Sequence, residues 1–379
     1  EFMKRWMWVD QFAVRGGFGY TGSIDKNALP FVVMTLGQSV IYDGQTVPTS
    51  FSYPNPNVKW QTKQDMNVGL DLSLFDYRLE LGVNYYNNIT RDVLDRKALP
   101  YSSGRSEVTE NVADIYNSGW EIDLGVTLLK NKSFQWYAKA NIAINDNKVK
   151  NTYYKDTKDL PKATLSNAHQ FVENQPVNGW YGYKFAGINP INGAVMTYTG
   201  NGEATLDMSV SGATWPIPSV FYLGNLTPPV VGGFSTSANW KQLIFSANFE
   251  FKTGHKIKSF NTFRSLDARN RHTSEANRWR EPGDISNVPA MSEAFTTYSS
   301  YMYDILLEKG NYLRCSYMTL GYNLKPEWLH KIGFSTARLS FTAKDLFTVS
   351  SYSGIDPALM GSFGYPNSRK YTITLNVGF

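Results

Sequence analysis

Apolar and polar residues alternate with a period of two along several segments of the chain. The clearest case is the stretch 371–379, which reads Y-T-I-T-L-N-V-G-F. One face of this predicted strand carries five apolar residues: Tyr371, Ile373, Leu375, Val377 and Phe379. Strands of bacterial outer-membrane β-barrels show this alternation, because their outer face contacts lipid and their aromatic residues lie at the membrane interfaces. We therefore interpret these five residues as a membrane assembly signal.

The same alternation predicts further strands. Three pairs are joined by short turns: 66–74 with 77–85, 120–128 with 134–144, and 234–240 with 243–251. Other strands are predicted at 12–20, 312–322, 337–347 and 371–379. The segment 312–322 alternates poorly, which indicates a β-bulge. Nine residues tilted by about 40° rise roughly 23 Å, close to the apolar height of an outer-membrane barrel.

Long polar stretches separate the pairs. They run near 26–57, 98–117, 151–230, 253–300 and 350–368. Short turns thus alternate with long loops, as in outer-membrane barrels, whereas a soluble sandwich shows evenly spaced turns. Charged residues at inward positions indicate a wet lumen, since a small dry core could not hold them. These residues are Arg78, Glu80, Glu121, Asp123, Lys139, Arg338 and Lys344. We predict an all-β transmembrane antiparallel barrel with roughly nine to eleven strands in this chain.

Composition agrees with this interpretation. Aromatic residues make up 15% of the 379 residues, yet the mean hydropathy is −0.35. No run of about 18 apolar residues exists, which excludes a transmembrane helix. The net charge of +5 does not argue for nucleic acid, and the single Cys315 excludes an intramolecular disulfide framework. Residues 1–10 lack the apolar core of a signal peptide, so we expect that the natural N-terminus is missing and that the chain is a fragment.

Short motifs spread over nearly all of the chain resemble the C-terminal part of SusC/RagA-type TonB-dependent outer-membrane transporters. They are A-V-R-G-G-F-G-Y-T-G at 13–22, N-V-G-L-D-L at 67–72, N-S-G-W-E at 117–121, Y-G-Y with G-I-N-P within 181–190, G-G-F-S at 232–235, R-W-R-E-P-G-D at 278–284, Y-L-R with L-G-Y within 312–322, D-L-F-T at 345–348 and G-I-D-P at 354–357. No single motif is specific, but their order and spacing are. One departure is Asp345, where the family has Asn.

The resemblance implies a barrel of about 22 strands with a plugged lumen, of which residues 1–379 supply roughly the C-terminal half. It further implies a bacterial outer-membrane location and TonB-dependent import of oligosaccharides or peptides. A SusD-like surface lipoprotein would cap the barrel. The N-terminal plug, which contacts the TonB complex, is absent from this chain. No enzymatic activity, cofactor or metal is implied.

Two loop clusters are candidates for substrate binding. Trp180, Tyr181 and Tyr183, with Phe185, form an aromatic cluster that could stack on a sugar ring or hold a peptide side chain. The alternative is a rigid loop core or a contact with the capping lipoprotein. Arg278 and Trp279 lie in a basic loop that could contact an acidic substrate or a lipid head group. That loop also contains Arg264, Arg269, Arg271, His272 and Arg280. The alternative is a solvated loop, and nucleic-acid binding would require a far more basic chain.

Other chemistry is weakly supported. Residues 17–22 match G-x-G-x-x-G, but this motif ends a predicted strand and opens no helix, so the glycines are interpreted as easing strand packing. The four histidines, His169, His255, His272 and His330, have no metal-ligand spacing. His255 or His272 near Asp267 or Asp284 could serve a rim hydrolase, but their spacing does not indicate one. Two alternatives stay open: a smaller complete barrel that acts as a porin or rim hydrolase, and a soluble carbohydrate-binding β-protein.

Overall fold

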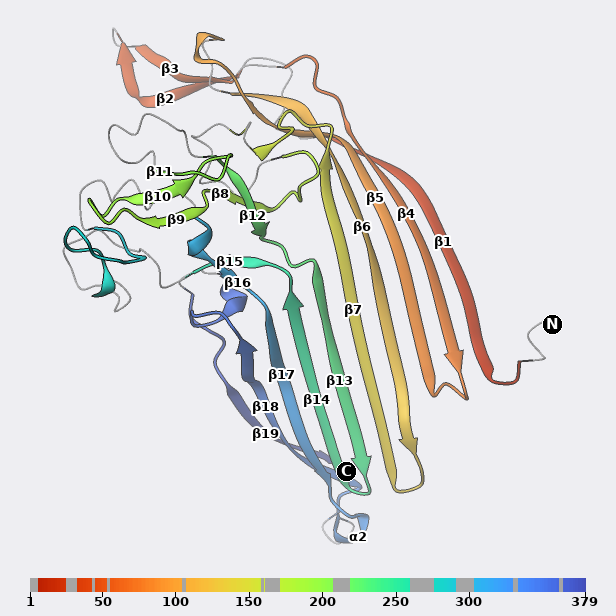
Figure 1. The fold of residues 1–379 in the computed structure, drawn as a ribbon. Coiled ribbons are helices and arrows are strands. Elements are labelled where there is room, and N and C mark those ends of the chain that lie inside the picture. The colour runs from red at the N-terminus through yellow and green to blue at the C-terminus, as the bar shows by residue number, and fades with distance from the viewer. Residues whose placement is uncertain are drawn as a thin grey trace.

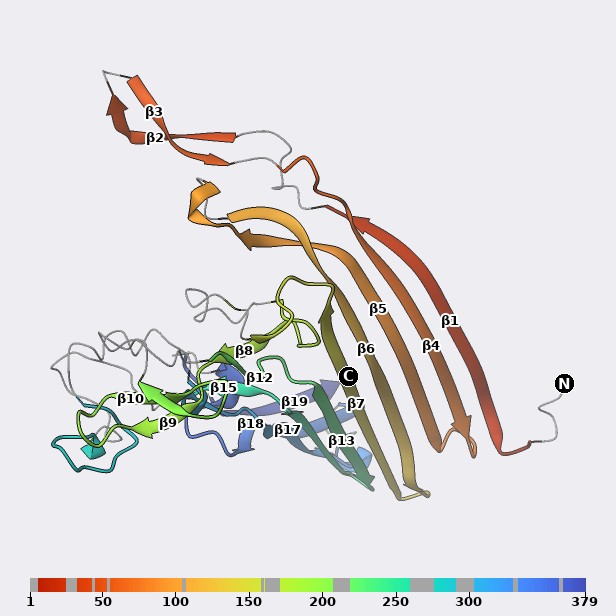
Figure 2. The same cartoon turned by 45° about the horizontal axis from the view of Figure 1, so that its top comes forward.

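Ten long antiparallel strands form one curved wall, as Figures 1 and 2 show. In this computed structural model the strands pair in the order β1-β4-β5-β6-β7-β13-β14-β17-β18-β19, so each wall strand lies beside its neighbours along the chain. Their bounds are β1 Val9–Ser23, β4 Gln61–Leu74, β5 Leu79–Ala98, β6 Glu107–Lys130, β7 Phe134–Lys150, β13 Val230–Trp240, β14 Leu243–Thr253, β17 Tyr312–Asn323, β18 Thr336–Ser350 and β19 Lys370–Gly378. The predicted all-β antiparallel fold is confirmed, and the number of wall strands falls within the predicted range.

The structure describes residues 6–24, 33–42, 45–52, 55–103, 107–157, 160, 171–206, 219–259, 276–290, 303–329, 333–360 and 364–379. No helix among these residues is both long and apolar enough to span a membrane.

The two faces of the wall differ as the alternation predicts. In β19, Ile373 is 74% exposed and lies opposite Phe341 of β18, which is also exposed on this outer face. On the inner face Thr374 lies opposite Ser340. The same register places Val68, Tyr85 and Trp120 side by side on the outer face. Apolar side chains therefore cover the outside of the wall, and polar ones cover the inside.

Aromatic residues mark the ends of the apolar band. We call the end of the wall with the short turns the turn end. There, Trp8 stacks on Phe75 with ring centroids 6.1 Å apart, and Phe379 packs edge-on against Phe334 at 5.1 Å. Toward the other end of β1, Tyr20 packs edge-on against Phe18 at 5.2 Å. These rings have the positions that interface aromatics occupy in outer-membrane barrels.

The first predicted hairpin differs in detail. The turn spans residues 75–78 instead of Phe75-Asp76 alone, and β5 begins at Leu79. Phe75, Asp76 and Tyr77 all adopt positive φ, with Tyr77 at 57°. The Asp10 carboxylate accepts a hydrogen bond from Tyr77 N at 2.9 Å, and this holds the turn. Arg78 consequently lies in the turn and not on the inner face of a strand.

The stretch 98–117, predicted as a loop, is mostly strand. β5 continues to Ala98 and β6 begins at Glu107, so a short connection containing the 3-10 turn Tyr101–Ser103 replaces the long loop. The Asn111 carboxamide holds this extension, because it accepts from Lys59 N at 2.8 Å and donates to Asp92 O at 2.6 Å. Asp92 adopts a φ of 56° where the register shifts. Side-chain bonds to the bulged backbone thus extend the pair beyond its apolar part.

The β-bulge predicted in 312–322 is confirmed. The pairing of β17 shifts between Cys315 and Tyr317 against β18, and it shifts at the same place against β14. The bulge at Ser316 reverses the facing of side chains along β17. Leu320 and Met318 face outward below it, whereas Arg314 faces inward above it, beside Glu250 and Thr348.

Most connections at the other end of the wall are long and carry their own structure (Figure 1). They contain β2 Val33–Tyr42, β3 Gln45–Ser52, β8 Gly179–Gly182, β9 Phe185–Ile188, β10 Val195–Tyr198, β11 Ala204–Leu206, β12 Phe221–Asn225, β15 Lys256–Lys258 and β16 Leu307–Lys309. Among the described residues, the turn end carries tight turns and the short helix α2, Pro326–Leu329. The predicted asymmetry between short turns and long loops is confirmed.

Candidate functional site

A separate hydrophobic core forms among the long loops. We call the described parts of 151–229 and 254–311 the loop module. Its buried residues include Tyr181 and Tyr183, each 1% exposed, and Tyr303, which is fully buried. Tyr183 and Tyr303 form a parallel bridge with ring centroids 5.9 Å apart, and Asp304 accepts a hydrogen bond from Phe185 N at 2.9 Å. Segments about 120 residues apart along the chain therefore fold into one unit.

Three of the predicted substrate residues lie in this core. Tyr181 and Tyr183 are packing residues in the structure, since almost none of their surface reaches solvent. Trp180 is half-buried and donates from its indole nitrogen to Lys256 O at 2.8 Å. Burial raises the pKa of Tyr181 well above its ordinary value, with a further contribution from Tyr222, and burial raises the pKa of Tyr222 to about 12. Both phenols are neutral at physiological pH.

The other two predicted residues, Arg278 and Trp279, belong to a clasp between two loops. Trp279 donates from its indole nitrogen to Pro190 O at 3.1 Å, and Gly283 N donates to the same oxygen at 2.7 Å. The Trp279 ring lies against Gly193, where a Cβ would be only 2.5 Å from ring carbon Cδ2. Arg278 forms a parallel bridge with Val288. The G-I-N-P and R-W-R-E-P-G-D motifs thus bind each other. Arg264, Asp267, Arg269, Arg271 and His272 lie outside the described residues.

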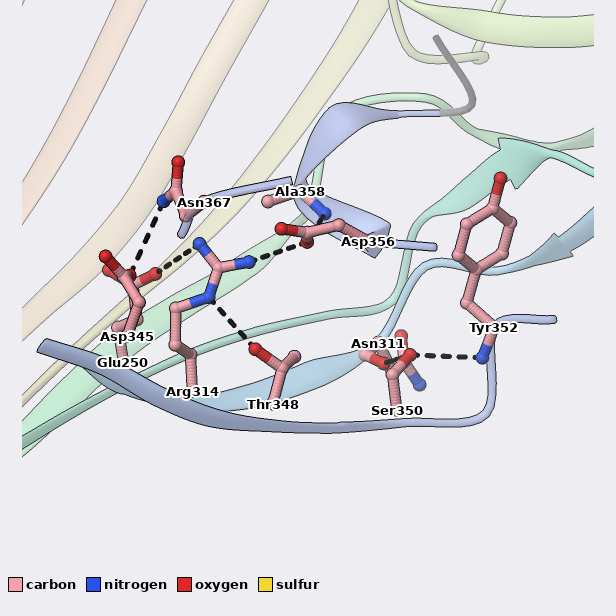
Figure 3. Close-up of polar contacts among 10 residues, drawn as sticks. All are labelled: Glu250, Asn311, Arg314, Asp345, Thr348, Ser350, Tyr352, Asp356, Ala358 and Asn367. Carbon is pink, nitrogen blue, oxygen red and sulfur yellow. Dashed lines mark hydrogen bonds and ion pairs between the residues drawn. The ribbon is translucent and has the colours of Figure 1, made fainter. Parts of the chain in front are cut away.

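A buried ion pair anchors the last long loop to the inner wall (Figure 3). Arg314 of β17 is 6% exposed, and its Nη2 lies 2.6 Å from Asp356 Oδ1. The guanidinium also donates to Thr348 Oγ1 at 3.1 Å and lies 3.8 Å from Glu250. Asp356 in turn accepts from Ala358 N at 2.9 Å, at the start of the 3-10 turn Pro357–Leu359. The Y-L-R motif therefore holds the G-I-D-P motif.

We call residues 351–360 the strap, because it joins the wall to the β15–β16 ribbon. Glu308 of β16 accepts from Ser353 N at 2.7 Å and from Ser353 Oγ at 2.6 Å. Tyr352 donates from its hydroxyl to Lys258 O at 3.2 Å. Burial favours the neutral form of Glu308, but hydrogen bonds from Ser259 and Ser353 outweigh it and lower its pKa. Arg314 was not predicted from the sequence as a site residue. The signal that could have found it is a charged residue within the apolar Y-L-R stretch, because a charge in a strand needs a partner.

The inner wall is polar and partly ion-paired. Arg15 lies 2.9 Å from Asp71, and Lys139 lies 3.8 Å from Asp123. A cavity of about 530 Å³ opens on the inner face of β1, β4, β5 and β6. Its lining is Arg15, Asn67, Gly69, Asn84, Tyr86, Asn88, Asn117 and Glu121. A second cavity of about 520 Å³ lies between the wall and the loop module, and its lining includes Asn145, Asn147 and Tyr222. Neutral carboxamides are the main polar groups of both.

The remaining candidate chemistry finds little support in the described residues. His255 is 3% exposed and packs against Gly310, whereas the Asp284 carboxylate accepts from the backbone of Arg280 and Glu281, so these two residues contact different groups. His169 and His330 lie outside the described residues. Within the described part of the chain, no three His, Cys, Asp or Glu side chains gather as metal ligands would. Residues 17–22 lie within β1 and open no helix.

A family model decides what this wall belongs to. The model described as "TonB dependent receptor-like, beta-barrel" matches residues 5–250. The chain belongs to this family. The TonB-dependent receptor chain is 28% identical to TonB-dependent receptor P3 of Formosa agariphila over its whole length, and 22% identical to TonB-dependent receptor SusC of Bacteroides thetaiotaomicron. It covers 40% and 38% of those two proteins.

A solved structure matches the same region. The structure of the RagAB peptide transporter matches 98% of this TonB-dependent receptor chain with a TM-score of 0.75 and 25% identity, over 41% of that chain. The resemblance to SusC/RagA-type proteins is therefore confirmed, and so are the transmembrane antiparallel barrel and the bacterial outer-membrane location. The chain spans about two fifths of the length of these relatives. Within the described residues the wall is open, with β1 and β19 at its edges.

Proposed function

We propose that this chain is the C-terminal barrel part of a transporter that imports oligosaccharides or peptides across the outer membrane, driven by TonB. The observation that carries the proposal is a barrel wall with a polar inner face and a folded loop module at one end, in a member of the TonB-dependent receptor family. Import of this kind requires binding and conformational change, with no bond made or broken.

The proposal includes two partners that act outside this chain. A plug, preceding residue 1 in the full-length protein, would contact the TonB complex, and a SusD-like lipoprotein would cover the loop module. Ile285 and Ile191, which are 100% and 75% exposed, support the second partner. Both lie in the two loops of the Trp279 clasp, and exposed apolar side chains at one tip favour a protein contact.

In this proposal the predicted substrate-binding residues hold the loops in place. Tyr181 and Tyr183 act by holding the loop module together, since they are buried. Trp180, Arg278 and Trp279 are half-buried. Trp180 ties β8 to β15, whereas Arg278 and Trp279 belong to the clasp between the two loops that face the proposed partner. We also propose that Tyr371, Ile373, Leu375, Val377 and Phe379 form the membrane assembly signal. Their support is a continuous apolar outer face on β19.

Deletion of the full-length gene tests the proposal. A deletion strain should lose growth on one class of glycan or peptide as sole nutrient, and a plasmid copy should restore it. A mutant in the TonB complex should show the same loss. Normal growth of the deletion strain on every glycan and peptide supplied would refute import.

A further inference from the structure

On the inner face of the wall, two tyrosines extend across β6 in opposite directions, one from β5 and one from β7. Tyr86 of β5 extends over Gly119 of β6, and its hydroxyl donates to Asn145 Oδ1 of β7 at 2.7 Å. Tyr137 of β7 extends over Gly125 of β6 toward Glu80 of β5. A Cβ at Gly119 would lie 2.6 Å from Tyr86 Cζ, and a Cβ at Gly125 would lie 2.6 Å from Tyr137 Oη. The glycines therefore leave the space that the phenols occupy.

This geometry makes both rings lie along the wall. A side chain that starts on one strand, crosses the next strand and ends beside the third cannot stand upright on the sheet, whose strands are about 4.8 Å apart. Both tyrosines are half-exposed, and neither stacks on another aromatic ring among the described residues. Each ring is thus a flat aromatic surface at the lumen.

The polar groups around the rings are mostly neutral or acidic. Asn84, Asn117 and Glu121 line the cavity beside Tyr86. Glu80 Oε2 lies beside the Tyr137 hydroxyl, 3.1 Å from the same Cβ position at Gly125. The nearby cations are engaged, because Arg15 pairs with Asp71 and Lys139 approaches Asp123. Carboxamides both donate and accept, and carboxylates accept, in the pattern that sugar hydroxyls need. Glu80 and Glu121 have no cation partner among the described residues, so they disfavour anionic ligands.

The two rings also connect the loop module with the turn end. Asn145, which accepts from Tyr86, lines the cavity that Tyr222 of the loop module shares. Gly119 and Gly125 are six residues apart on one strand, or roughly 20 Å at about 3.3 Å per residue. Tyr137 lies near the start of β7, beside the turn at 131–133. The polar and aromatic groups therefore follow a path from the loop module to the opposite end of the wall.

We propose that Tyr86 and Tyr137 are stacking platforms on a lumen-wall path for a neutral oligosaccharide. The flat face of each phenol would bind the apolar face of a sugar ring, and the flanking Asn and Glu side chains would bind its hydroxyls. This inference rests on the proposed import function and names both the substrate class and a part of its path. Flat rings beside hydroxyl-binding groups favour a sugar over a peptide backbone.

Transport kinetics in the full-length protein test the proposal. Tyr86→Ala and Tyr137→Ala should each reduce the initial import rate of a neutral oligosaccharide by roughly two- to tenfold, the range of an aromatic stacking contact. Tyr86→Phe keeps the ring but loses the Asn145 hydrogen bond, so it should retain more of the import rate than Tyr86→Ala does. Tyr85→Ala is the matched control, because Tyr85 packs on Trp120 on the lipid face of the same strand, with ring centroids 4.9 Å apart.

A chemical probe measures occupancy without relying on growth. In isolated outer membranes, Asn84→Cys should react with a polar maleimide, since the chain's native Cys315 is buried. The probes are neutral gluco-, manno- and xylo-oligosaccharides, with uncharged oligopeptides of matched length as the comparison. A neutral oligosaccharide should protect the new cysteine, and Tyr86→Ala should abolish that protection.

The outcomes separate the two proposals. Normal import in both alanine variants, or protection by peptides alone, would overturn the sugar path and leave import intact. Equal loss in Tyr86→Ala and Tyr86→Phe would show that the Asn145 hydrogen bond matters and the ring face does not. A deletion strain without any uptake defect would refute the import function itself.

Discussion

The barrel wall and the loop module are stabilised by different kinds of contact. In the wall, each residue's partner lies on the next strand, and the partners of Ile373 and Thr374 follow from the period of two. In the loop module, Tyr183 meets Tyr303 and Trp279 meets Pro190, so the partners lie roughly 90 to 120 residues away along the chain. The wall is a repeating local structure, whereas the module is a small core assembled from distant segments.

Because of this difference, aromatic residues have different structural roles in the two regions. On the wall, exposed aromatics such as Phe341 and Tyr371 stack on each other and face lipid. In the module, Tyr181 and Tyr183 are also aromatic, but they are buried. The same residue type is therefore an interface group in one region and a core group in the other, and burial is what distinguishes them.

The largest effect is expected where the two regions are tied together. Arg314→Leu should destabilise the strap by about 3–5 kcal/mol, because it leaves Asp356 buried without its cation. The measurement is the temperature at which the full-length protein loses its compact mobility in gel electrophoresis, together with protease cleavage within 351–360. The double variant Arg314→Leu with Asp356→Leu should recover part of the loss. A single variant as stable as the wild type would show that wall and strap are not coupled through this pair.

The next effect tests the wall alone. Ile373→Arg should lower the stability of the folded barrel by about 2–4 kcal/mol, since it places a charge on the lipid face near the middle of the membrane. Thr374→Arg is the matched control on the inner face and should change stability by less than about 1 kcal/mol. Urea titration of the full-length protein refolded into liposomes measures both. Equal effects at the two positions would contradict the assignment of faces.

The sequence was sufficient for the wall because its pattern is local. The period of two located all ten wall strands, and the poor alternation in 312–322 indicated a bulge, which the structure places at Ser316. It failed at the ends of strands. Positive φ at Phe75, Asp76 and Tyr77 and the Asn111 bonds to Lys59 and Asp92 decide where strands stop, and neither leaves a periodic signal.

The site was less predictable for the same reason. The motifs containing Tyr181, Arg278 and Trp279 were identified, but only their contacts show that they form a core and a clasp. Arg314 was not among the predicted inward charges, because the bulge at Ser316 changes which side chains of β17 face inward, and nothing local paired it with Asp356. Tyr86 and Tyr137 were missed because a phenol crossing a glycine on the next strand requires the register between strands.

Within the module, a smaller effect should follow from opening the clasp. Trp279→Ala should destabilise the loops by about 1–3 kcal/mol, because it removes a half-buried ring and its bond to Pro190. Limited proteolysis of the purified full-length protein, without any partner, should then cleave within 276–290 faster. Ile285→Ala is the control in the same loop, since Ile285 is fully exposed and should have no effect on cleavage. Similar cleavage rates in both variants would show that Trp279 does not hold the clasp.

The smallest effect concerns pH at the junction between the two regions. Burial and the nearby Lys252 lower the pKa of His255 below its ordinary value of 6.5. Its Nδ1 finds no hydrogen-bond partner among the described residues, and its ring packs against Gly310. The folded state therefore favours the neutral ring.

The unfolded state binds the proton more readily, so His255 stabilises the folded module fully above pH 6.5 and loses that contribution as the pH falls toward its folded pKa. Protection factors, which correct hydrogen exchange for its slower intrinsic rate at lower pH, should accordingly fall at residues 253–259 between pH 7 and pH 5 more than in the wall strands. In His255→Phe the difference should vanish, and in Lys252→Gln it should shrink, because removal of the cation raises the pKa of His255. A junction whose exchange keeps the same pH dependence in His255→Phe would show that this histidine does not couple the module to the wall.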